Sequence, residues 1–319
     1  MLVAAPGGVW NAELAKDRHE PVRWIWDGML AAGAMTLLTG SWKAGKSTLV
    51  SLLLDRRREG GQLLGRTVGA GATIVVSEEE PRMWARRQAT LDFGPRVCFF
   101  CRPFASVPSL GRWRRFVDKI SQLVDEHKID LLVLDPVACF LPAAENHAAS
   151  LVKALGELQA LTEEGLAVLL LHHPKKGATA IGQAARGSGA LPAFVDIVLE
   201  LRVPRGSSET RRRRLHGFGR FAQTPRMLLA ELNADGADYV VLPDTAPEDI
   251  DAAFEMLDAL LRAAGVPLKC TEILARWPQS APPPNATTLW RWLARGCERG
   301  ALVREGTGSK VEPFRYRAA

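Results

Sequence analysis

One short motif limits what this chain can fold into, because it fixes the order strand, loop, helix. Residues 40–47 read Gly-Ser-Trp-Lys-Ala-Gly-Lys-Ser and closely follow the strand-like run Ala34–Leu38. A glycine-rich turn between a strand and a helix lets successive backbone N–H groups point at one spot. The positive end of the following helix adds to this attraction for anions. The motif therefore predicts a phosphate-binding loop at the start of a helix.

The residue types in the loop indicate which phosphate compound it holds. In loops of this pattern the lysine, here Lys46, reaches the β- and γ-phosphates, and the next hydroxyl, here Ser47, binds Mg²⁺. We therefore expect ATP and Mg²⁺ as ligands. The expected nucleotide-binding residues are Gly40, Ser41, Trp42, Lys43, Ala44, Gly45, Lys46, Ser47 and Thr48.

Bulk properties narrow the class of protein further. A chain of 319 residues has room for about two domains. Its net charge of +6 favours an acidic partner such as nucleic acid. The five cysteines lack the spacing of a disulfide framework, and the longest aliphatic run, Leu166–Leu171, is too short to cross a bilayer. We therefore expect a cytoplasmic protein that does not enter a membrane.

Apolar strands alternate with amphipathic helices through most of the chain, which predicts an α/β fold. Short, continuous apolar strands between helices are typical of a mostly parallel sheet covered on both faces. Four later strands are expected to extend this sheet in antiparallel fashion. The predicted strands are 34–38, 72–76, 96–100, 131–134 and 167–171, then 194–201, 212–218, 226–232 and 239–242, and the predicted helices are 46–57, 81–91, 110–126 and 148–162.

The pattern changes after a stretch rich in Pro and Asp. Three helices are expected at 252–264, 271–277 and 286–299, followed by strands at 301–304 and 313–317. Three helices and a hairpin are the winged-helix arrangement. We therefore divide the chain into an N-terminal segment packed against the core (1–33), an α/β domain (34–243), a linker (244–251) and a small C-terminal winged-helix domain (252–319).

Three other strand ends carry groups suited to triphosphate hydrolysis. Asp135 ends one aliphatic strand and is expected to hold Mg²⁺ through a bound water. Residues 78–80 are three glutamates, which either include the base that activates water or form a solvated helix cap. His172 and His173 end another strand, where a polar side chain can contact the γ-phosphate. Metal binding by the two histidines is the alternative, but neighbours on a strand point to opposite sides.

In combination these stretches resemble the RecA-like ATPases, particularly the plasmid RepA-type hexameric helicases. The resemblance covers roughly residues 20–243 and rests on Leu37–Thr48, Ile74–Pro81, Leu131–Pro136 and Leu170–Gly177, followed by Ala185–Gly189. It implies a RecA-like P-loop core. Its register implies Glu79 as the catalytic glutamate, with Glu78 as competitor, His173 as the γ-phosphate sensor and Asp135 as the second Mg²⁺ residue.

The resemblance also implies assembly, although the chain departs from the pattern there. Members of this group form homo-oligomers, usually hexameric rings, in which an arginine enters the ATP site from a neighbour. The segment Asp196–Glu200 lacks the arginine expected near its middle. Arg186, Arg202 and Arg220 remain the alternatives.

Basic residues indicate where nucleic acid would bind. The first group flanks or lies in the glycine-rich segment 177–189, and the second shares the last predicted helix, which a winged helix would place in the major groove. These residues are Lys175, Lys176 and Arg186, then Thr287, Thr288, Arg291 and Arg295. A docking role of this domain toward protein is the alternative. The run Arg211–Arg214 is either a solvated strand flank or a contact to a subunit or to DNA.

These observations predict an ATP hydrolase that acts on DNA, with a motor or helicase of a replication or mobile-element system as the leading interpretation. The alternative is a DNA-binding regulator or replication initiator that uses ATP as a switch and hydrolyses it slowly. A small-molecule kinase would share only the phosphate-binding loop.

Overall fold

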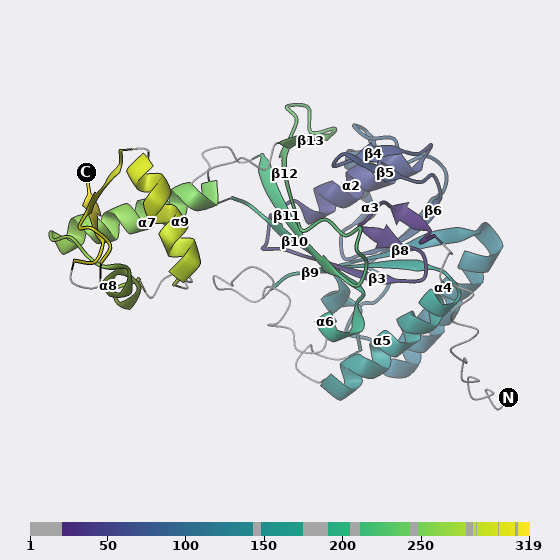
Figure 1. Cartoon of the computed structure of the whole chain (residues 1–319). Helices are drawn as coiled ribbons and strands as arrows, with labels where there is room; N and C mark the ends of the chain where they lie inside the picture. Colours follow the sequence, from purple (N-terminus) through teal and green to yellow (C-terminus); the bar gives the residue numbers. More distant parts are fainter. Residues whose placement is uncertain are drawn as a thin grey trace.

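The protein is described from a computed structural model, in residues 21–142, 148–174, 191–204, 211–242, 248–278, 283–284, 286–298, 300–309 and 312–319. Its central element within these residues is a nine-stranded sheet (Figure 1). The strands are β3 (Met35–Thr39), β6 (Ala72–Ser77), β7 (Val97–Cys101), β8 (Ile129–Asp135), β9 (Ala167–His172), β10 (Ile197–Arg202), β11 (Arg212–Gly219), β12 (Met227–Leu232) and β13 (Tyr239–Leu242).

The strand order is β13-β12-β11-β10-β3-β9-β8-β6-β7. The run from β10 to β7 is parallel, whereas β11, β12 and β13 are added antiparallel. Because parallel strands end at the same edge, the segments that follow β3, β6, β8 and β9 meet there. This edge is where the sequence predicts the functional groups.

Helices cover both faces of the sheet, as expected for a parallel arrangement. In β8, Leu131 and Val133 pack into the cluster that includes α2, whereas Leu132 and Leu134 pack into the cluster that includes α4 and α5. Positions 131–134 of this strand therefore all need apolar residues, which is why they read as a continuous run. The helices are α2 (Lys46–Arg57), α3 (Pro81–Gln88), α4 (Leu110–His127), α5 (Ala148–Glu163) and α6 (Leu191–Phe194), with a 3₁₀ turn, η2 (Val137–Cys139). The α/β prediction is confirmed.

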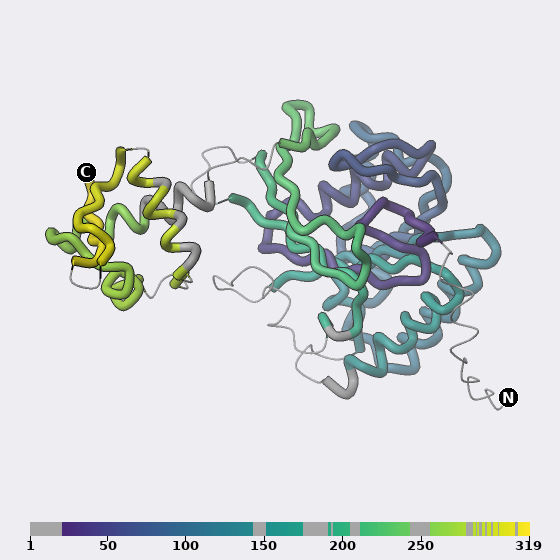
Figure 2. The backbone as a smooth tube through the Cα atoms, viewed as in Figure 1, coloured from purple at the N-terminus to yellow at the C-terminus, as the bar shows by residue number. Residues whose placement is uncertain are grey.

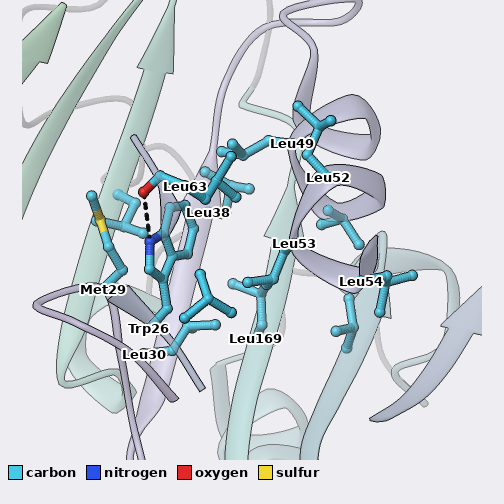
Figure 3. Close-up of a cluster of buried hydrophobic side chains, with 14 of the residues drawn as sticks. Trp26, Met29, Leu30, Leu38, Leu49, Leu52, Leu53, Leu54, Leu63 and Leu169 are labelled. Atoms are coloured by element: carbon cyan, nitrogen blue, oxygen red, sulfur yellow. Dashed lines mark hydrogen bonds between the residues drawn. The ribbon is translucent and has the colours of Figure 1, made fainter. Parts of the chain in front are cut away.

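A second sheet, of four short strands, was not predicted. Its order is β2-β1-β5-β4, and each strand has only two or three residues, too few for a periodic pattern to appear. The Trp26 indole N–H donates to the Leu63 carbonyl at 3.1 Å, beside the leucines of α2 (Figure 3). This sheet thus packs residues 24–31 onto α2. Residues 1–20 of the predicted N-terminal segment lie outside the described residues. The strands are β1 (Trp24–Trp26), β2 (Leu30–Ala31), β4 (Gly61–Leu63) and β5 (Arg66–Val68).

The C-terminal part has three helices and a two-stranded antiparallel sheet in the predicted order (Figure 1), and its backbone is traced in Figure 2. It has a core of its own, in which Leu257 and Leu261 pack with Ile273 and Leu293. The elements are α7 (Glu248–Ala264), α8 (Cys270–Ala275), α9 (Ala286–Glu298), β14 (Leu302–Glu305) and β15 (Arg315–Ala318).

The linker prediction of 244–251 is too long, because α7 already begins at Glu248. Residues 243–247 lie outside the described residues. Among the helices that the structure describes, none is long and apolar enough to cross a membrane.

A buried arginine ties the end of α2 to the start of the parallel strands. Arg57 is 1% exposed and forms an ion pair with Asp130. Its Nε donates to Thr73 Oγ1 at 2.9 Å, and Nη2 donates to the Ala72 carbonyl at 3.3 Å. A buried guanidinium with these partners is costly to remove, because the groups left behind lose their hydrogen bonds.

We predict that Arg57→Ala lowers the free energy of unfolding by about 3 kcal/mol, since it leaves Asp130 and Thr73 without their partner. The neighbouring Arg58, 40% exposed, pairs with Asp92 at the surface. Arg58→Ala is the matched control and should change stability by less than about 0.5 kcal/mol. Urea denaturation of both variants measures the difference, and equal losses would contradict the assignment.

Candidate functional site

The loop of residues 40–45 connects β3 to α2 and needs glycine at two positions. Gly45 is the N-cap of α2 with φ +96°, a left-handed conformation that side chains disfavour. A Cβ on Gly40 would come within 2.5 Å of the Leu201 carbonyl oxygen on β10. The chain can therefore turn tightly enough to bring Lys46 under the loop.

Lys46 is the buried cation of the site, at 4% exposure. Its Nζ donates to the carbonyls of Gly40 at 2.7 Å and Ser41 at 3.2 Å, and lies 3.0 Å from His173 Nδ1. Burial lowers the pKa of Lys46 to about 8, and burial and the Lys46 charge lower the pKa of His173. At neutral pH a neutral His173 therefore accepts from a charged Lys46.

A hydroxyl and a carboxylate meet beside this lysine. The Ser47 hydroxyl, in the first turn of α2, donates to Asp135 Oδ2 at 2.8 Å at the end of β8. Burial, with smaller contributions from Glu79 and Glu78, raises the pKa of Asp135 to about 6. Two hard oxygen ligands side by side fit Mg²⁺, which binds through few protein oxygens and otherwise keeps water.

The three glutamates after β6 have different partners. Ser77 is level with Asp135 in the β6–β8 register, which places the glutamates beside the Ser47–Asp135 pair. Both Glu79 carboxylate oxygens accept from Arg87 of α3, one at 2.9 Å. Glu80 Oε1 accepts from Arg102 at 2.9 Å.

Glu78 is held differently from its two neighbours. Its Oε2 accepts from the Cys139 thiol of η2 at 2.9 Å. Burial, and then Glu78 itself, raises the pKa of Cys139 to about 12, so the thiol stays protonated and donates. The charge of Glu78 also opposes the lowering of the His173 pKa. Glu78 therefore lies within electrostatic reach of both Asp135 and His173.

The two histidines at the end of β9 face different surroundings, as expected of neighbours on a strand. His172 is 1% exposed, and its Nδ1 lies 3.0 Å from Thr39 Oγ1 on β3. His173 contacts Lys46 instead. Within the described residues, no group of three or more His, Cys, Asp or Glu side chains is arranged to hold a metal.

The structure thus brings most of the predicted site residues together. Lys46, Ser47, Asp135, Glu79 and His173 meet at the ends of neighbouring strands. Thr48 continues the first turn of α2. Trp42 is different: it is 75% exposed, with Lys43 Nζ 4.2 Å from its ring centroid.

The predicted nucleic-acid residues are not placed in the same way. Lys175, Lys176 and Arg186 lie outside the described residues. For the other four only the backbone is described, as part of α9: Thr287, Thr288, Arg291 and Arg295.

Two of the three arginines predicted as candidates for a neighbouring site lie in the described residues. Arg202 is paired with Glu200 on its own strand, and the 73% exposed Arg220 lies 3.1 Å from Asp196.

Sequence reasoning missed three residues that contact the site. Arg87 and Cys139 hold the glutamates, and Arg213 Nε donates to the Ala44 carbonyl of the loop at 2.6 Å. Nothing local in the sequence marks Arg87 or Cys139. Arg213 lies in the arginine run, and the two-residue period of a strand is the signal that it faces differently from Arg212.

A mostly parallel sheet with this loop and these strand ends defines a RecA-like P-loop ATPase core. The AAA domain family matches residues 4–179, which is more than half of the 319 residues. The chain belongs to this family.

The fold has a counterpart among solved structures, the KaiC-like protein PH0186 from the hyperthermophilic archaeon Pyrococcus horikoshii OT3. The match has a TM-score of 0.52 and 18% identity, and it covers 70% of this chain and 100% of that one. At this identity the similarity shows the fold alone. No curated protein matches the chain.

We predict that Asp135→Asn makes the protein more stable at pH 7.5 in the absence of Mg²⁺ and nucleotide. The folded-state pKa of Asp135 is raised from 3.8 to about 6. The folded protein therefore binds this proton more tightly than the unfolded chain, and the ionised carboxylate costs stability above pH 6. Removing the charge should raise the free energy of unfolding by about 2 kcal/mol.

This gain should narrow as the pH falls from 6 toward 4, because the wild-type carboxyl becomes protonated in the folded state. Denaturant unfolding at pH 7.5 and pH 5 measures both values. Asp118→Asn, an exposed carboxyl on α4, is the control and should show no such pH-dependent gain. A loss of stability at pH 7.5 for Asp135→Asn would contradict the prediction.

Proposed function

We propose that this chain is a DNA-dependent ATPase, and that its ATP hydrolysis drives a motor or helicase of a replication or mobile-element system. One observation supports hydrolysis. Lys46 and the Ser47–Asp135 pair lie close to Glu78 and Glu79 at one edge of the sheet. Binding alone would need only the loop. The carboxylates supply what hydrolysis needs in addition.

The residues at this edge of the sheet have separate roles in this proposal. Lys46 offsets the negative charge of the β- and γ-phosphates, and backbone N–H groups of residues 40–48 hold the phosphate chain. Ser47 and Asp135 would hold Mg²⁺, which, when bound, neutralises charge on the phosphate oxygens. Trp42, being exposed, is left to contact solvent or a partner.

Of the two candidate bases, we propose Glu78. The sequence register favours Glu79, but both oxygens of Glu79 already accept from Arg87, so Glu79 is held toward α3 and not toward a water beside Asp135. Glu78 accepts from a thiol, a weak donor. Glu79 with Arg87 would then set the position of the segment that carries Glu78.

His173 is proposed to sense the state of the γ-phosphate. Its Nδ1 lies 3.0 Å from Lys46 Nζ, so any change in what Lys46 contacts alters the hydrogen bond of His173. The following residues, 177–189, are the basic glycine-rich segment predicted to grip DNA. Hydrolysis would in this way be reported to the DNA-binding segment.

The action on DNA is supported by charge and domain organisation. The chain carries a net charge of +6, and its C-terminal part has three helices and a two-stranded sheet with a core of its own. We propose that this part is a winged helix that binds DNA through Thr287, Thr288, Arg291 and Arg295, and that Lys175, Lys176 and Arg186 contact the phosphate backbone. A homo-oligomer, such as a hexameric ring, would let the exposed Arg220 reach a neighbouring site.

We predict that single-stranded DNA stimulates steady-state ATP hydrolysis and that Lys46→Ala abolishes it. Glu78→Gln should lower kcat about 100-fold, because it removes a general base, while leaving ATP binding intact. Glu79→Gln is the matched variant one residue away and should lower kcat less. Hydrolysis is measured with and without DNA for the wild type and all three variants.

Two results would change this reading. A slow rate that DNA does not alter would replace the motor by the alternative, an ATP-switched DNA-binding regulator or replication initiator. A larger loss for Glu79→Gln than for Glu78→Gln would return the role of base to Glu79.

A further inference from the structure

An arginine from the antiparallel half of the sheet contacts the phosphate-binding loop. Arg213 lies on β11, and its Nε donates to the Ala44 carbonyl oxygen at 2.6 Å. A second nitrogen of the same guanidinium, Nη1, donates to the Arg212 carbonyl at 2.7 Å, which steadies the group. The contact joins residues 169 positions apart in the sequence. The loop is thus supported by a strand outside the motif.

The place of contact matters because of the geometry of the peptide bond. The bond between Ala44 and Gly45 is trans, so its C=O and N–H point in opposite directions. Arg213 holds the Ala44 carbonyl on its own side of the loop. The N–H of Gly45 must therefore point away from Arg213.

The surroundings strengthen this hydrogen bond. The guanidinium is charged, and charge-assisted hydrogen bonds are shorter and stronger than neutral ones. Tyr239 of β13 is 5% exposed, and a Cβ on Gly45 would lie 3.2 Å from Arg213 Nε and 3.5 Å from the Tyr239 hydroxyl. Gly45 therefore packs directly against these two side chains, which keep water away from the Ala44 carbonyl.

We propose that Arg213 is a positioning residue for the nucleotide: by holding the Ala44 carbonyl it aims the Gly45 N–H at the phosphate chain and so sets the affinity for ATP. This inference rests on the proposed function, since it assumes that the loop binds ATP. Arg213 itself does not reach the phosphates in this scheme. It acts through the loop backbone, from the side opposite the ligand.

The test is the equilibrium dissociation constant of ATP, measured calorimetrically on the full chain in Mg²⁺ without DNA. Arg213→Ala should weaken ATP binding about tenfold, because a hydrogen bond from a charged donor is lost. Arg213→Lys retains the charge and one possible donor, and it should recover part of the affinity. The rise in KM should exceed the fall in kcat at saturating ATP.

Arg212→Ala is the matched control, because Arg212 is the preceding arginine of the same strand and its Nε donates to Glu231 at 3.0 Å instead of to the loop. It should change the dissociation constant by less than about twofold, because the half-buried Arg212–Glu231 pair does not include the loop. Thermal unfolding of each variant shows that it is folded under the assay conditions.

Equal affinities of the wild type and the folded Arg213→Ala variant would overturn the inference and leave the proposed function standing. An equal weakening by Arg212→Ala would also overturn it, since the effect would then be one of net charge. If the wild type itself fails to bind ATP, the proposed function fails, and that result is distinct from the other two.

Discussion

The arrangement of the site follows from one buried charge, the ammonium group of Lys46. A cation that is 4% exposed is tolerated only where dipoles or counter-charges replace the lost water. The carbonyls of Gly40 and Ser41 supply this on one side and a neutral His173 on the other. The loop must therefore turn back over the lysine, which explains why its bend requires glycine.

Burial also costs free energy for the charged carboxylate nearest to Lys46. Asp135 is 5% exposed, and its raised pKa reflects burial and the neighbouring Glu79 and Glu78. Burying Asp135 beside further acids is unfavourable for the folded protein, and the attraction to Lys46 offsets this only in part. Shifted pKa values of this kind gather at functional sites, where the chemistry requires them. In this account, Mg²⁺ and a phosphate chain are the charges that the edge is built to receive.

Local patterns in the sequence are enough to predict the fold of the core and the positions of its strand ends. The loop motif, the continuous apolar strands and the amphipathic helices each appear within a short window, so the α/β core with its parallel sheet is predictable. The four-stranded sheet containing Trp26 is not, because its strands are too short to show a period. The early start of α7 at Glu248 is hidden by a segment rich in Asp and Pro.

The side-chain contacts of the site were not predictable from the sequence either, and here the reason is different. Whether Glu78 or Glu79 faces the site depends on Arg87 and Cys139, which approach from other elements. The support of the loop by Arg213 depends on how β11 is registered beside β10. Such contacts between distant segments have no local signature, so a run of four arginines looks like surface charge until the sheet is assembled.

The most direct test of the account is whether Mg²⁺ strengthens ATP binding through Ser47. Calorimetric titration of the full chain with ATP, in Mg²⁺ and in EDTA, gives the stoichiometry and both affinities. The account predicts one ATP per chain, tighter binding with Mg²⁺, and loss of that gain in Ser47→Ala with binding in EDTA retained. No ATP binding by the wild type, or an undiminished Mg²⁺ effect in Ser47→Ala, would contradict it.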